Sequence, residues 1–173
     1  DDALLDPELA DEDYAALALA LHVATLDLAD WHQMFGHIRE ARTLYKHLFA
    51  EISGITSSEI TFAQPKLLYF PKPKDPRRPD DHRRLPVNGA VEVQFDVMPT
   101  GRIRKLETIA STPDGLMDFQ VRRNLRDAIF RPALNDDGPC ITEAFSYRYE
   151  FAHYPDLTDT ESEAITTSAS ESD

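Results

Sequence analysis

The sequence predicts an α+β protein in which a helical hairpin precedes a small β-β-α-β domain. Apolar residues recur every three or four positions through the first fifty residues, a run of prolines follows, and from Ala90 the apolar period falls to two. A period near 3.6 is typical of an amphipathic helix and a period of two is typical of a half-buried strand. We expect an antiparallel helical hairpin at 1–54, a Pro-rich basic connector at 55–88, the α+β domain at 89–151 and a disordered acidic tail at 152–173.

Two apolar stripes predict the hairpin. The first stripe, which we expect to be buried, comprises Leu17, Leu21, Ala24, Leu28, Trp31 and Phe35, and the second comprises Ile38, Ala41, Tyr45, Leu48 and Ile52. Gly36 lies between them, and Gly54 follows the second, as suits a helix end. Fragments of the pattern, among them Trp31 and Gly36, resemble a single tetratricopeptide unit. Such a unit alone has to dock on the rest of the chain or on another molecule, although a plain two-helix appendage explains the pattern equally well.

The connector is defined by its prolines and its charge. Six prolines stand between Gln64 and Asn88, and because proline lacks a backbone N–H they exclude a long helix and a central strand. The apolar patch at 67–70 is expected to lie extended against a folded surface. Residues 66–84 hold seven Lys or Arg against three Asp. This basic strip is expected to dock on the chain's own acidic flanks, and an anionic surface such as lipid headgroups is the alternative.

Alternation and turn chemistry predict the C-terminal domain. Val91, Val93, Phe95 and Val97 alternate with polar residues, and a turn ending at Gly101 leads into a second strand at 102–110, along which the apolar parity changes as it would at a bulge. A helix then carries Met117, Val121, Leu125 and Ile129 on one face and ends at Pro132. The last strand places Phe145, Tyr147, Tyr149 and Phe151 on one side. Together these elements form a three-stranded antiparallel sheet packed on one helix.

The order of these segments resembles the TonB C-terminal domain family. The resemblance lies in the strand at 91–97, the turn at Gly101, the helix-ending stretch 128–133, the turn at Gly138 and the final strand at 145–151. Members of this family act in the periplasm. In energy transducers of the TonB type, an inner-membrane helix couples to a proton-driven motor complex, and the C-terminal domain adds a short segment of an outer-membrane receptor to its sheet as an extra strand.

The resemblance implies a protein-binding module rather than an enzyme. The last strand, 142–151, would receive the partner, with main-chain groups supplying most of the attraction. The partner-binding residues implied are Thr142, Ala144, Ser146, Arg148 and Glu150. The implied partner is a segment of an outer-membrane receptor or of another envelope protein, and the implied location is the periplasm. The alternative is a soluble periplasmic adaptor that brings two proteins together and has no role in transport.

The chain differs from a full transducer in two ways. It has no apolar run long enough for a membrane helix, and its connector is short. It begins at Asp1 and Asp2, which would fit a mature protein whose export signal or anchor has been removed. The lone Cys140 excludes an internal disulfide, and the oligomeric state is left open.

Charge and motifs argue against other classes of function. A net charge of −13 disfavours nucleic acid as a partner, because phosphate binding needs a positive surface. His37 and Glu40 share a helix face and could supply two metal ligands, but a closed site needs more. Cys140 with His153 lacks a group to orient the base. We expect no catalytic residue, no cofactor and no metal.

Overall fold

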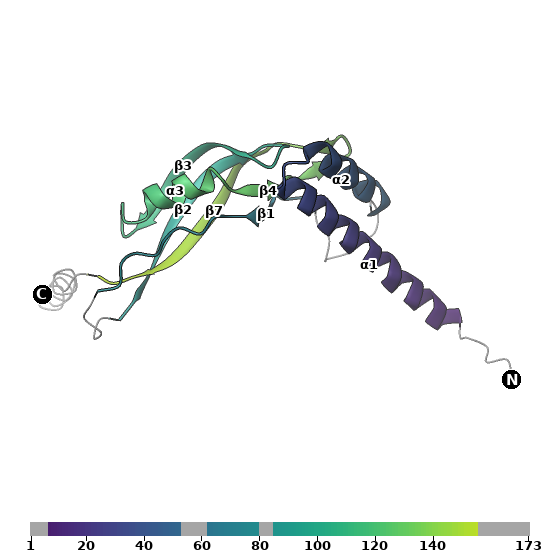
Figure 1. Ribbon diagram of the computed structural model, residues 1–173, viewed down its shortest axis with the longest axis horizontal. Coiled ribbons are helices and arrows are strands. Elements are labelled where there is room, and N and C mark those ends of the chain that lie inside the picture. The colour runs from purple at the N-terminus through teal and green to yellow at the C-terminus, as the bar shows by residue number, and fades with distance from the viewer. Residues whose placement is uncertain (1–6, 53–61, 80–84, 156–173) are drawn as a thin grey trace, which may run out of the picture. The chain divides into compact units, whose positions relative to one another are not determined.

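The computed structural model describes residues 7–52, 62–79 and 85–155 (Figure 1). The predicted acidic tail beyond residue 155, Gly54 and the Arg83–Arg84 end of the basic strip lie outside the described residues. Two compact units are present, one comprising 1–71, 95–105 and 125–145, and the other 72–94, 106–124 and 146–173. The predicted boundaries at 54, 88 and 151 therefore remain predictions.

The first unit contains the helical hairpin. Helix α1 spans Pro7–Met34 and α2 spans Ile38–Ile52. Gly36, at φ +81°, takes the left-handed conformation that the turn between them requires. The middle of the second apolar stripe is buried, with Ala41, Tyr45 and Leu48 at most 1% exposed, while Ile38 and Ile52 at its ends are half-buried. The core that they form also includes Leu26, Ala29, Phe62 and Leu134.

The first apolar stripe is exposed, which corrects the prediction that it is buried. Leu17 is 68% exposed, Phe35 is 62% exposed and Trp31, which we expected in the core, is 45% exposed. A neighbouring face of α1, marked by the buried Leu26 and Ala29, meets α2 instead. Because α1 is apolar on two faces, its periodicity could not decide between them. The buried polar residues of α1, described below, select the inner face.

Two short ribbons complete the first unit. Strand β1, Lys66–Tyr69, pairs antiparallel with β4, Ile129–Arg131, placing Leu67 opposite Phe130. The apolar patch of the connector is therefore a strand in a two-stranded ribbon, which agrees with its predicted extended form. Strand β5, Leu134–Asn135, turns back into β6, Gly138–Pro139, at the predicted glycine turn.

Helix α3 is shorter than predicted. It spans Asp118–Leu125, and Ile129, assigned by periodicity to its apolar face, lies in β4. Met117, Val121 and Leu125 are fully buried as predicted. The residue before a proline is disfavoured in a helix, and pairing with β1 supplies the backbone partners that further helical turns would have provided.

The three long strands form the predicted antiparallel sheet. Strands β2, Val87–Val97, β3, Ile103–Thr112, and β7, Thr142–His153, lie in the order β3-β2-β7. The inward residues predicted for β2, Val91 to Val97 at every second position, are all buried. The N–H of Met98 donates to the carbonyl of Arg102 at 2.8 Å, closing the predicted turn between β2 and β3. The α+β class is therefore confirmed.

Candidate partner-binding strand

Strand β7 lies at one end of the three-stranded sheet, beside β2. Tyr149 and Phe151 are only 7% and 6% exposed, whereas Ser146, Arg148 and Glu150 are exposed. The predicted division of β7 into an apolar side and an outward side is correct over this stretch. Thr142, the first residue of the strand, is half-buried.

The beginning of β7 is held by a carboxylate from the central strand. Ala144 has φ +51° and its N–H donates to Oδ1 of Asp96 at 3.0 Å, while Oδ2 of Asp96 lies 2.8 Å from Nζ of Lys105 on β3. Lys105 also has a positive φ, of 53°. The hydrogen bond from Lys105, together with that from Ala144, lowers the pKa of Asp96 below its usual 3.8. A local irregularity of β3 was predicted from its apolar parity, and the left-handed Lys105 marks it.

Ion pairs join the outward side chains farther along β7. The guanidinium of Arg148 contacts Oε1 of Glu92 on β2, and its Nε donates to Oε1 of Glu150 at 3.1 Å. Glu150 and then Glu92 raise the pKa of Arg148. Exposed ion pairs of this kind contribute little to stability because water screens them. These side chains could therefore exchange their ion pairs for contacts with a partner at small cost to the stability of the fold.

Two open clefts border the Glu92–Arg148 pair within the second unit. One, of about 310 Å³, is lined by polar and small residues that include Asn88, Ser111 and Glu150. The other, of about 300 Å³, is lined by Val93, Ile109, Ser146 and Tyr147 together with the pair itself. Sites for small molecules are mostly apolar and bury most of the ligand. These clefts are better suited to individual side chains of a segment lying on the strand.

The connector passes close to β7 within the second unit. Pro73 is buried, and Asp75 lies near enough to Tyr149 for its charge to contribute, after burial, to a raised pKa of that phenol. Lys72 holds Asp75 through an ion pair of 3.3 Å. A segment that approaches this end of β7 therefore meets residues 72–79.

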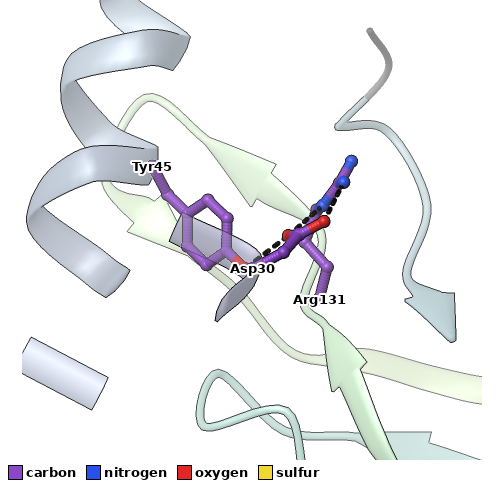
Figure 2. A network of polar contacts seen from close by, with 3 residues as sticks. All are labelled: Asp30, Tyr45 and Arg131. Carbon is purple, nitrogen blue, oxygen red and sulfur yellow. Dashed lines mark hydrogen bonds and ion pairs between the residues drawn. The ribbon is translucent and has the colours of Figure 1, made fainter. Parts of the chain in front are cut away.

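A buried polar network in the first unit joins both helices to β4. Figure 2 shows Asp30 of α1 between Tyr45 of α2 and Arg131 of β4. The Tyr45 hydroxyl and Nε of Arg131 both donate to Oδ1 of Asp30 at 2.8 Å, and Nη2 of Arg131 donates to Oδ2. Burial first, and then the charge of Asp30, raises the pKa of Tyr45, which keeps the phenol protonated as a donor. The guanidinium of Arg131 also lies 5.9 Å from the Phe62 ring centroid.

A second polar residue of α1 holds the turn between β2 and β3. Nε2 of Gln33 donates to the carbonyls of Thr100 at 2.7 Å and Phe130 at 3.3 Å. A Cβ at Gly101 would lie 2.2 Å from both Nε2 of Gln33 and the Phe130 carbonyl oxygen, so only glycine fits there. Sequence reasoning missed the roles of Asp30, Gln33 and Arg131. The available signal was a carboxylate and an amide three residues apart on one face of a largely apolar helix.

The metal and thiol candidates of the sequence have ordinary contacts. Nδ1 of His37 lies 3.3 Å from Nδ1 of His32, and the Cys140 thiol lies 3.3 Å from the carbonyl of Ala133, to which it donates. Within the ranges that the structure describes, no three His, Cys, Asp or Glu side chains are grouped so as to hold a metal ion. In the same ranges, no helix has the length and apolarity needed to cross a membrane.

Comparisons with known proteins give a distant likeness to solved structures. No family profile and no curated protein matches the chain. Among solved structures, the solution NMR structure of the Pseudomonas aeruginosa TonB CTD is 23% identical to this chain with a TM-score of 0.36, and the match covers 60% of this chain and 92% of that chain. A likeness at this identity and TM-score does not bear on function.

Proposed function

We propose that this chain is a periplasmic, TonB-like protein-binding module that takes up an extended segment of an outer-membrane receptor as a strand along β7. The observation that carries the proposal is the position of β7 at one end of the sheet, with its apolar side buried and its outward side polar. A terminal strand is the place where a sheet is extended, because main-chain groups of the newcomer can continue its hydrogen-bond ladder.

The residues on the outward side supply a means of choosing a sequence. Side chains of an added strand point alternately to the two faces of the sheet. Those on the outward face would meet Ser146 and the ion pairs of Arg148 with Glu92 and Glu150. The clefts beside the Glu92–Arg148 pair would receive the larger of these side chains. The resemblance of residues 91–151 to the TonB C-terminal domain family supports the same mode of binding.

Residues 72–79 of the connector would compete with the incoming segment for the surface beside β7. Because Pro73 is buried and Asp75 acts on Tyr149, the incoming segment has to displace residues 72–79 wherever the two overlap. Residues 73, 76 and 79 are prolines without an N–H to donate, so the connector offers β7 fewer donors than an ordinary strand would. Binding should therefore be of moderate affinity and reversible.

The test uses synthetic peptides copied from the periplasm-facing segments of outer-membrane receptors, titrated into the full chain. Hydrogen exchange should slow at the amides of 142–151 in the presence of a binding peptide. A series of that peptide with single backbone N-methyl groups should lose affinity at every second position, because only alternate N–H groups of a strand point at its neighbour. Uniform tolerance of N-methylation would exclude strand addition.

A pair of proline variants locates the binding edge on the protein. Ser146→Pro on β7 should abolish peptide binding, whereas Glu107→Pro, at an exposed position of β3 at the other end of the sheet, should leave it intact. Circular dichroism and thermal unfolding would establish that both variants fold. Normal binding by a folded Ser146→Pro variant would rule out the β7 edge. If no receptor peptide binds while other envelope proteins do, the adaptor without a transport role is the better hypothesis.

A further inference from the structure

Helix α1 carries a continuous apolar stripe on the face that α2 leaves uncovered. Seven positions follow one another at steps of three and four without interruption, which is the heptad pattern of a coiled coil. All seven side chains are exposed, from 45% for Trp31 to 76% for Tyr14 among those with a stated value. This α1 seam comprises Tyr14, Leu17, Leu21, Ala24, Leu28 and Trp31 on the helix, and Phe35 in the turn that directly follows Met34.

The inner face of α1 already has its partners. Leu26 and Ala29 pack in the hairpin core, and Asp30 and Gln33 are bonded to β4 and to the turn beyond β2. The seam therefore cannot turn inward without breaking these contacts. A helix that is apolar on two faces is typical of one that is covered on both.

The N-terminal turns of α1 have little support within the hairpin, because Leu19 is the first of the described α1 side chains that packs against the hairpin core. With 28 residues against the 15 of α2, α1 extends past the end of α2, as Figure 1 shows. A helical segment of fewer than about 12 to 15 residues is marginal in water without tertiary contacts. Tyr14 and Leu17, in this N-terminal part of α1, are 76% and 68% exposed among the residues that the structure describes, so the seam continues beyond the hairpin core.

We infer that two copies of this chain associate through the α1 seam as a parallel coiled coil. Strict spacing of 3.5 residues per turn is what keeps an apolar line facing a second helix along the supercoil. The six larger seam residues expose on the order of 800 Å² on each copy, which is of the same order as the roughly 800 Å² that each partner buries in a stable protein interface. A patch of this size exceeds what soluble monomers usually display.

The charged residues that flank the seam are compatible with a parallel arrangement. The seven positions of a coiled-coil heptad are labelled a to g, and the seam residues here occupy a and d. In a parallel pair, the residue at g, directly before an a position, faces the residue five places later on the other helix. Asp27 precedes Leu28 and would therefore face His32 of the second copy. Asp27 is exposed and His32 is half-buried, so both can reach the boundary of the seam. A carboxylate opposite an imidazole is compatible with close packing of the two helices.

The first experiment measures the mass of the full chain by sedimentation equilibrium across a wide range of concentrations. The wild type should reach twice 19.6 kDa, and Leu21→Glu/Leu28→Glu should weaken association at least about 100-fold, which is a change of roughly 2.7 kcal/mol. Phe119→Glu/Ile141→Glu is the matched control, because both residues are exposed apolar side chains off the seam. This control should associate as the wild type does.

A disulfide experiment tests the orientation. In a Cys140→Ser background, Leu17→Cys alone and Leu28→Cys alone should each give a disulfide-linked dimer on mild oxidation, because a parallel pair sets each seam residue against its own copy. An antiparallel pair would link only the mixture of the two variants, which would overturn the proposed orientation.

Three outcomes would overturn the α1 seam as an interface between copies. They are a monomeric wild type at every concentration, an unchanged dimer in Leu21→Glu/Leu28→Glu, and equal loss of association in the Phe119→Glu/Ile141→Glu control. Peptide binding at β7 is measured separately and does not enter this result, so the proposed function and the seam can fail independently.

Discussion

Single buried residues connect parts of the first unit that are far apart in sequence. Asp30 and Arg131 are 101 residues apart, and each is 8% exposed or less. Burying such a pair gives little net stability, because desolvation offsets most of the attraction. Removing one partner is costly, since the other charge stays buried. The pair therefore acts mainly by specifying which face of α1 turns inward.

Arg131→Met should lower the free energy of unfolding by about 3–5 kcal/mol, because it leaves the Asp30 carboxylate buried with only Tyr45 as a donor. Asp30→Leu/Arg131→Met should recover most of that loss. Urea unfolding of both variants measures the effect. Arg126→Met, at an exposed position, is the control and should stay within about 0.5 kcal/mol of the wild type. A double variant as unstable as the single one would contradict this account.

The ionisation of Asp96 makes the free energy of unfolding depend on pH in the acid range. Its folded pKa lies below the usual 3.8 because of Lys105 and the Ala144 N–H, so its contribution is present above that pH and is lost as the pH falls through the folded pKa. Asp96→Asn should therefore lose less stability than the wild type on acidification below pH 3.8. Urea midpoints measured against pH test this, with Glu107→Gln as an exposed-carboxylate control. Parallel curves for Asp96→Asn and the wild type would show that Asp96 does not contribute.

At the scale of elements, the helical hairpin is connected to β4 and to the turn between β2 and β3 by buried polar contacts. Three of its polar side chains, Asp30, Gln33 and Tyr45, take part in contacts that reach β4 and the turn at Thr100. A detachable adaptor arm would lack such contacts. The contacts agree with a two-helix appendage that completes a core, and both this interpretation and the likeness to a tetratricopeptide unit remain predictions.

Removing residues 1–54 should prevent the remaining chain from reaching a single folded state. The deletion leaves Arg131 without its carboxylate and exposes Leu134 and Phe62 of the hairpin core. Dispersion of amide signals in a proton–nitrogen correlation spectrum reports the result. The full chain carrying Leu21→Glu/Leu28→Glu, which changes only the outer face of α1, should remain well dispersed. A well-dispersed spectrum from residues 55–173 would show that the hairpin is separable.

At the scale of the whole molecule, charge opposes self-association. Each copy carries a net charge of −13, so two copies repel each other at low ionic strength. Apolar contact along the α1 seam has to overcome this repulsion. The basic strip at 66–84 is too small to reverse the overall sign.

Added salt should therefore tighten the proposed dimer. Raising the ionic strength from about 0.01 M to about 0.15 M shortens the Debye length from about 30 Å to about 8 Å, which screens the repulsion and leaves the apolar attraction. The dissociation constant from sedimentation equilibrium should fall several-fold. If salt instead weakens association, the contact is one between opposite charges, such as the basic strip on acidic residues.

Local pattern predicted much of the secondary structure and the side-chain division of two strands. The alternation of β2 and of residues 145–151, the turn at Gly101 and the two-helix hairpin all follow from spacing that is read along a single segment. The end of α3 did not follow, because β1, more than fifty residues earlier, pairs with 129–131 and withdraws them from the helix. Local preference cannot register such a partner.

The sequence by itself determined the α+β class, the inward side of β7 and the presence of an apolar stripe on α1, because period and turn chemistry are properties of neighbouring residues. Only the tertiary structure decided that this stripe stays outside and that Asp30 meets Arg131, whereas the strand order confirms the expectation that the last strand ends the sheet. The physical reason is that an amphipathic pattern specifies only which face of a helix or strand is apolar. Whether that face is buried depends on residues distant in the chain that pack against it.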